Sequence, residues 1–235
     1  MGAEKPVRDV RMSDLRLVVF DMDGTLIDSQ AFILAAMKRA FAKAGWPAPK
    51  DSEVLAIVGL SLEEAVSTIL PHLSAVEARE GANLYRESFI ELRAERGGEA
   101  TSALYPGARA ALERLHRQEE TLLGVATGKA RRGLDHAYKS HDLGRFFVTS
   151  QTADDHPSKP HPSMLERALY ETGCEAQQAV MIGDTEFDIA MGKAAGFATV
   201  AVSWGYHPLE RLAQADYLID DFAALDAVLD DIWRG

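Results

Sequence analysis

Short apolar runs alternate with amphipathic stretches along most of the chain. Continuous runs rich in Val, Ile, Leu and Phe are typical of strands that are buried on both faces of a sheet. They lie at 17–20, 122–126, 146–149, 179–182 and 198–202. Helical patterns follow at about 107–118, 130–140, 162–171 and 186–195. This alternation indicates βαβ units, so we predict an α/β fold with a Rossmann-like parallel sheet flanked by helices.

The interval between the first two apolar runs breaks this rhythm. It carries helical patterns at 29–45, 61–70 and 74–96, with no strand pattern between them. Glycines at 97 and 98, and then Tyr105-Pro106-Gly107, mark the return of the chain. We therefore predict a helical-bundle cap at 28–100, inserted after strand one, and an α/β core formed by 1–27 and 101–235.

Composition excludes several classes of protein. The formal net charge of −11, without a dense Lys/Arg cluster, argues against a nucleic-acid partner. No apolar run approaches the ~18 residues that span a bilayer, and no secretory signal is visible, so we expect no membrane partner. Cys174 is the only cysteine, which rules out a disulfide framework within the chain and fits a reducing compartment. We expect a cytoplasmic protein, either a monomer or a homodimer.

Four of the apolar runs lead into polar groups. In open parallel sheets, ligands bind outside the carboxyl ends of the strands, so these groups should meet at one edge. The four groups are Asp21-Met22-Asp23-Gly24-Thr25, Thr127-Gly128-Lys129, Ser158-Lys159-Pro160 and Gly183-Asp184-Thr185-Glu186-Phe187-Asp188. The convergence carries more weight than any one of the groups alone.

The residue types at this edge indicate phosphoryl transfer. Asp21, Asp184 and Asp188 offer the hard oxygen ligands that suit Mg²⁺. The hydroxyl of Thr127 and the ammonium of Lys159 would then neutralise the oxygens of a transferring phosphoryl group. A carboxylate can act as nucleophile and form an aspartyl phosphate, and Asp23 is placed to protonate the leaving alcohol and later to deprotonate water.

Other interpretations of these motifs are weaker. A calcium loop would need a carboxylate at position five and Glu at position twelve, where Thr25 and Phe32 stand. The segment at 124–130 is one residue too short for a Walker A loop, and Lys129 is better explained as a helix-start residue. Asp154, Asp155, His156 and His161 could suggest a second metal site, but a solvated loop explains them better. Arg86 and Arg93 could reach a substrate carboxylate, although surface arginines are commoner.

Taken together, the motifs resemble those of the haloacid dehalogenase superfamily of phosphohydrolases, and within it the phosphoglycolate phosphatases. The resemblance spans nearly the whole chain and implies a type-one helical cap. It implies that Asp21 is nucleophile and metal ligand, and that Asp23 is the acid/base with its backbone carbonyl on Mg²⁺. It also implies that Asp184 binds the metal. Asp188 would bind it directly or through water, or would orient Lys159. The remaining implied substrate-binding residues are Gly24, Thr25 and Gly128.

The expected function is therefore Mg²⁺-dependent hydrolysis of a small phosphate monoester, phosphoglycolate-like or related. The alternative is a sugar phosphomutase similar to β-phosphoglucomutase. Gly59 breaks two helical patterns, so the segment at 57–61 is either a substrate-binding cap loop that faces the core or a simple inter-helix turn. Sugar mutases of the family carry a basic residue in that loop, and none is present here. A non-enzymatic receiver domain would be about half as long, with its phosphate acceptor on a middle strand.

Overall fold

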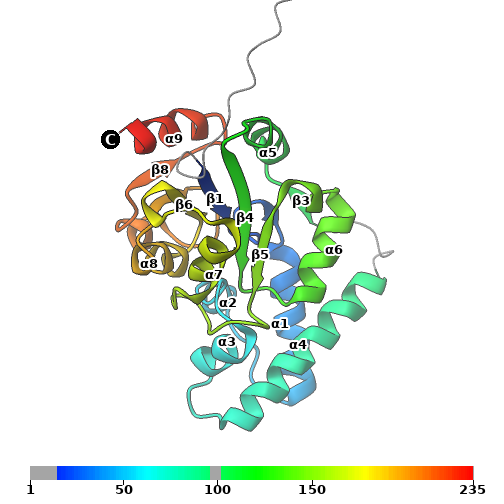
Figure 1. The fold of residues 1–235 in the computed structure, drawn as a ribbon. Coiled ribbons are helices and arrows are strands. Elements are labelled where there is room, and N and C mark those ends of the chain that lie inside the picture. The colour runs from blue at the N-terminus through cyan, green and yellow to red at the C-terminus, as the bar shows by residue number, and fades with distance from the viewer. Residues whose placement is uncertain (1–14, 96–101, 235) are drawn as a thin grey trace, which may run out of the picture.

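The computed structural model describes residues 15–95 and 102–234. Its main sheet has the strand order β5-β4-β1-β6-β7-β8, and all neighbouring strands pair in parallel (Figure 1). The strands are β1 (Arg16–Phe20), β4 (Thr121–Thr127), β5 (Thr149–Thr152), β6 (Ala179–Gly183), β7 (Ala198–Val202) and β8 (Tyr217–Ile219). The parallel α/β sheet expected from the sequence is confirmed.

Helices cover both faces of this sheet. Val18 and Phe20 of β1 point into one apolar cluster, whereas Leu17 and Val19 point into the other, as the two-residue period of a strand requires. The first face is covered by α5 (Ala108–His116), α6 (Arg131–His141) and α9 (Leu225–Arg234). The second is covered by α7 (Ser163–Thr172) and α8 (Glu186–Ala194). Both faces of the strands are therefore apolar, which explains their continuous apolar runs.

A separate helical cluster lies between β1 and β4 in the chain and occupies the lower part of Figure 1. It consists of α1 (Gln30–Ala44), α2 (Asp51–Leu55), α3 (Leu62–Ile69) and α4 (Ala75–Glu95). These helices share an apolar cluster that includes Phe32, Phe41 and Tyr85 and is completed by Tyr206, which follows β7. Ion pairs join α1 to α4, with Arg39 bound to Glu95. The cap boundaries at 28 and 100 stay a prediction, and residues 96–101 lie outside the described ones.

The structure corrects one sequence prediction. The run at 146–149 is not the third strand: Gly144–Phe146 form a 3-10 turn that buries Phe146, and the strand is the polar Thr149–Thr152. Within the described residues, no strand lies between the helices α1 and α4, as expected, but the two short strands β2 (Ile27–Asp28) and β3 (Ala103–Leu104) flank them and pair antiparallel. The short elements β8 and α2 were also missed.

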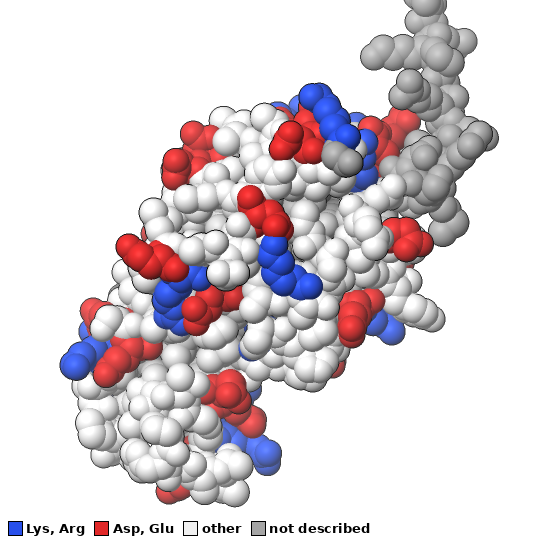
Figure 2. Space-filling view, turned by 90° about the vertical axis from the view of Figure 1, so that its left-hand side faces the viewer, with Lys and Arg blue, Asp and Glu red and all other residues white. Residues whose placement is uncertain are grey.

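Charged side chains are distributed over the surface. On the face shown in Figure 2, acidic and basic side chains are interspersed, with no broad basic patch there. Among the described residues, no helix has both the length and the hydrophobicity to cross a membrane.

Candidate active site

Four strand ends meet at one edge of the sheet. Asp21 follows β1, and Thr127 ends β4. Asp184 follows β6, while Lys159 comes from the loop between β5 and α7. All four side chains are buried. The convergence therefore occurs as the parallel topology predicts.

Lys159 links the carboxylates of two elements. Its ammonium nitrogen lies 2.8 Å from Oδ1 of Asp21 and 2.6 Å from Oδ1 of Asp188. The second oxygen of Asp188 accepts bonds from the backbone N–H (3.1 Å) and the hydroxyl (2.7 Å) of Thr185, at the start of α8. Burial by itself lowers the pKa of Lys159, but the two carboxylates outweigh it and raise the pKa above its usual value. Lys159 is thus a fixed buried cation.

Asp184 is held by two donors. The hydroxyl of Thr25 donates to Oδ1 at 2.8 Å, and the backbone N–H of Tyr206 donates to Oδ2 at 2.9 Å. Gly24 has a φ of 89°, and a Cβ there would lie 2.2 Å from Oδ2 of Asp184. Glycine is required at this close approach. The contacts of Gly24 and Thr25 are thus with Asp184, and their binding of substrate stays a prediction.

The carboxylates of Asp21, Asp184 and Asp188 could hold a metal ion. Each offers one oxygen, and these oxygens lie within 4.8 Å of one another. Burial raises the pKa of Asp21 to about 6, helped by the charges of Asp188 and Asp23 and opposed by Lys159. Burial, with the charges of Asp21 and Asp188, raises the pKa of Asp184 well above its usual value. A concentration of negative charge on hard oxygens fits a divalent cation such as Mg²⁺.

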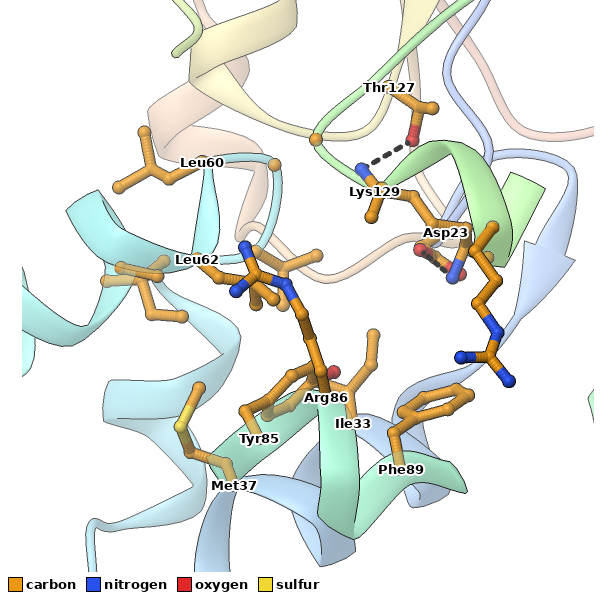
Figure 3. A pocket seen from close by; sticks show the side chains of 18 of the residues that line it. Asp23, Ile33, Met37, Leu60, Leu62, Tyr85, Arg86, Phe89, Thr127 and Lys129 are labelled. Carbon is orange, nitrogen blue, oxygen red and sulfur yellow. Dashed lines mark hydrogen bonds and ion pairs between the residues drawn. The ribbon is translucent and has the colours of Figure 1, made fainter. Parts of the chain in front are cut away.

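Asp23 is bound by groups that the sequence analysis missed. The hydroxyl of Ser29 donates to its Oδ1 at 2.6 Å, and the ammonium of Lys129 lies 2.7 Å from its Oδ2 (Figure 3). The phenol oxygen of Tyr206 in turn accepts the Ser29 N–H at 2.8 Å. Lys129 does precede α6, as expected, but its side chain turns into the site. Tyr206 follows β7, so the strand-end argument could have found it.

The segment at 57–61 faces the core. A Cβ on Gly128 would lie 2.6 Å from the carbonyl oxygen of Gly59. The backbone N–H of Ser61 donates to Oγ of Ser158 at 2.8 Å, in the loop that also carries Lys159. Of the two alternatives that the sequence left open, the structure therefore shows a loop packed on the strand ends.

A cavity of about 200 Å³ lies between this loop, the helices α1, α3 and α4, and the strand ends. Asp21, Asp23, Thr127, Gly128 and Gly59 all line it. The hydroxyl oxygen of Thr127 accepts the Lys129 N–H at 3.2 Å, so its own proton is free to be donated. Figure 3 shows Asp23, Thr127 and Lys129 on one side and the apolar side chains of the helices on the other.

The second candidate metal cluster does not form. His156 bonds to Oε1 of Gln151 (2.9 Å) and to Oγ of Ser163 (2.8 Å). Oδ2 of Asp154 accepts the backbone N–H of Arg131 at 2.7 Å. These residues hold the loop after β5 in place, and within the described residues they are not gathered around a common point.

Comparison with known proteins agrees with this geometry. The model of the haloacid dehalogenase-like hydrolase family matches residues 18–202. A phosphoglycolate phosphatase of Vibrio cholerae is 30% identical over 91% of this chain and 96% of its own. A pyrophosphatase of Bacillus velezensis is 31% identical over 91% and 97%. A haloacid dehalogenase-like hydrolase structure from Streptococcus pneumoniae has a TM-score of 0.77 and 26% identity, covering 92% of this chain and 98% of that one.

Proposed function

The chain belongs to the haloacid dehalogenase-like hydrolase family, and from this premise we propose that it is a Mg²⁺-dependent phosphatase for small phosphate monoesters. The observation that carries the proposal is the shared cavity of Asp21 and Asp23. The first carboxylate is held by a buried cation, and the second is held separately by Ser29 and Lys129. A nucleophile and an acid therefore face one bound substrate.

In the first step, an oxygen of Asp21 attacks phosphorus and the bond from phosphorus to the alcohol oxygen breaks. Asp23 gives a proton to that leaving oxygen. The ammonium of Lys159 and the hydroxyl of Thr127 stabilise the charge on the phosphoryl oxygens. The products are an aspartyl phosphate on Asp21 and the free alcohol.

In the second step, water hydrolyses the aspartyl phosphate. Asp23 now accepts a proton from the water as its oxygen attacks phosphorus. The bond from phosphorus to Asp21 breaks and inorganic phosphate leaves. Because Asp23 ends protonated, it is ready for the next leaving group.

Asp21, Asp184 and Asp188, with the backbone carbonyl of Asp23, are the residues that would hold Mg²⁺. When bound, Mg²⁺ would supply charge neutralisation to the phosphoryl oxygens. We propose that Asp188 acts mainly by orienting Lys159, since its oxygens already bind Lys159 and Thr185.

We propose that residues 28–100 form a cap over this site. The contact of Gly59 and Ser61 with the strand-end loops supports this assignment. Gly128 and Gly59 would then line the entry of the substrate, and closure of the cap would exclude water. We further propose a cytoplasmic enzyme, monomeric or homodimeric, acting on a small phosphorylated molecule rather than on a nucleic acid.

The test is phosphate release from a panel of phosphate monoesters, with and without Mg²⁺. Asp21→Asn should lower kcat by about 10⁴-fold or more, because it removes the nucleophile. The exposed Asp220→Asn is the matched control and should keep full activity. Undiminished turnover in Asp21→Asn would refute the mechanism. A sugar 1-phosphate that is isomerised faster than it is hydrolysed would establish the phosphomutase alternative.

A further inference from the structure

The side of the cavity that faces the strand ends is polar, but the opposite side is almost entirely apolar. We call the latter the roof of the cavity. It includes Ile33, Met37, Leu60, Leu62, Tyr85 and Phe89, all visible in Figure 3. Ile33, Leu60 and Tyr85 are buried. The roof is therefore suited to an apolar group.

This composition fits neither a sugar nor a very small hydroxy acid. Sugar hydroxyls need acceptors, and no carboxylate or amide side chain lines the roof within the described residues. Glycolate is too short to cover the apolar side chains, which would keep facing water. A cavity of ~150 Å³ with aliphatic and aromatic walls takes one benzene ring. The volume of about 200 Å³ found here leaves room for a ring and a substituent.

Two arginines at the rim of the cavity have no carboxylate partner in the described part of the chain. Arg93 of α4 lies with its guanidinium 5.2 Å from the centre of the Phe89 ring, and its Nε is buried without a hydrogen-bond partner among those residues. Neither Arg93 nor Arg132 forms an ion pair with a carboxylate of the described residues. Burial lowers the pKa of Arg93, and the charge of Arg132 lowers it further.

A third arginine, Arg86, also lines the cavity. Its side chain rises from α4 towards Leu62 in Figure 3. Its one described partner is the neutral Oδ1 of Asn83, at 2.8 Å. Guanidinium groups at a cavity rim that have no carboxylate partner within residues 15–95 and 102–234, in a chain of net charge −11, indicate an anion that comes with the ligand.

We propose that the substrate is the phosphate monoester of an aromatic alcohol that carries a carboxylate. Its ring occupies the roof, and its carboxylate is bound by Arg93, whose charge is close enough to Arg132 for the two to interact. The inference rests on the proposed phosphatase function and names the substrate class of that site. The phosphate would lie at Asp21, on the opposite side of the cavity.

The test compares kcat/KM for para-carboxyphenyl phosphate, phenyl phosphate, phosphoglycolate and a hexose phosphate. We expect para-carboxyphenyl phosphate to be the best substrate, about 10- to 100-fold better than phenyl phosphate, because it gains charge-assisted hydrogen bonds. Calorimetry with para-carboxyphenylphosphonate and phenylphosphonate measures the same preference as binding, without turnover.

Arg93→Gln should remove the preference for the carboxylate in both measurements, whereas Arg93→Lys should retain part of it. Arg79→Gln is the matched control. Arg79 lies on the same helix, outside the cavity, and is 66% exposed beside Glu63. It should leave all four substrates unaffected.

The outcomes separate the two proposals. Higher kcat/KM for phosphoglycolate or the hexose phosphate, or an unchanged preference in Arg93→Gln, would overturn the substrate class while leaving the phosphatase intact. Absence of turnover with every ester would overturn the phosphatase proposal. In that case, a preference for the carboxylated phosphonate that is lost in Arg93→Gln would still support the binding site.

Discussion

The two sides of the cavity are built in opposite ways. The strand-end side, which we call the floor, presents Asp21 and Asp23 to the cavity. Behind Asp21, the floor is supported by buried groups: Lys159 binds Asp21 and Asp188, and Asp184 is held by Thr25 and Tyr206. On the roof, the side chains are apolar and the arginines lack carboxylate partners among the described residues. The charged groups of the floor thus bind one another, whereas the arginines at the rim of the roof have no described carboxylate partner.

This difference separates the residues that determine the type of reaction from those that determine which substrate is accepted. Interlocked buried charges cannot be changed singly, because removing one leaves its partners desolvated and unpaired. The floor therefore fixes the type of reaction. Apolar side chains and rim arginines can be exchanged at a modest energetic cost, so the roof sets which alcohol is accepted.

The largest expected effect comes from removing the buried cation that supports the floor, Lys159. Lys159→Met would leave Asp21 and Asp188 buried without their shared cation. We expect a loss of about 10³-fold in kcat and of about 3–5 kcal/mol in the free energy of unfolding. Phosphate release and urea unfolding measure the two effects.

The matched control is another lysine–carboxylate pair outside the site. Lys193 is paired with Asp216 and is 42% exposed. Lys193→Met should cost at most about 1 kcal/mol and leave turnover unchanged, because water screens an exposed pair. Equal destabilisation by the two substitutions would contradict the picture of an interlocked floor.

The second prediction tests the close contact between Gly128, on the floor, and the loop at 57–61. A Cβ on Gly128 would lie 2.6 Å from the carbonyl oxygen of Gly59 and 2.7 Å from that of Leu60, and these backbone atoms would have to move. Gly128→Ala should displace the 57–61 loop and lower kcat/KM by about 100-fold, since small misplacements at a reacting centre are costly. Steady-state kinetics measure the effect. Gly144→Ala, where the nearest atom is 3.4 Å away, should have no effect, and equal losses would refute the argument.

Much of the floor was predictable from the sequence because strand topology determines it. The apolar runs located β1, β4, β6 and β7, and residues that follow parallel strands must meet at one edge. The third strand was misplaced because Thr149–Thr152 carries polar side chains. Thr149 and Gln151 are buried, but they hydrogen-bond to Glu171 of α7, so burial there leaves no apolar signal.

The partners of Asp23 were not predictable in this way. Ser29 lies at the start of α1, and Lys129 looked like an ordinary helix-start residue. Both lie near strand ends of the core, but the sequence does not show that their side chains turn towards Asp23. The roof was missed for the same reason: its apolar side chains have the helical spacing of any core helix, and the sequence does not say which of them face the site.

The third prediction tests whether the hydrogen bond from Ser29, in the proposed cap segment, supports the catalytic role of Asp23. Ser29 donates to Asp23 at 2.6 Å, and its side chain makes no capping bond to α1. Ser29→Ala should therefore leave the helix intact and lower kcat by about 10-fold, the value of one hydrogen bond to a charged group, with little change in KM. Pre-steady-state kinetics would place the loss in the step that releases the alcohol.

Ser74→Ala is the control for this variant. Its hydroxyl also donates to a carboxylate, Oε2 of Glu77, at 2.7 Å, but on the exposed start of α4. It should not change kcat. A matching decrease in both variants would mean that Ser29 acts on the stability of the cap and not on Asp23.

The smallest effect concerns His207, which follows β7 and lies against the start of α8. Nδ1 of this buried side chain accepts the Glu186 N–H at 3.2 Å, and its ring contacts Phe187 edge-on. Burial lowers its pKa to about 4, helped by Arg211 and opposed by the charges of Asp188 and Glu186. Protonation at Nδ1 would break the bond to Glu186.

The sign of the pH dependence follows from that pKa. The unfolded state binds a proton on His207 near pH ~6.5, but the folded state does so only near pH 4, so between these values unfolding takes up a proton. The stability that neutral His207 contributes is thus complete above pH ~6.5 and is lost as the pH falls towards 4. His207→Gln should flatten the decline of the urea midpoint over this range, by at most ~1.4 kcal/mol per pH unit. The exposed His72→Gln should keep the wild-type slope, and an unchanged slope in His207→Gln would show that other groups govern acid unfolding.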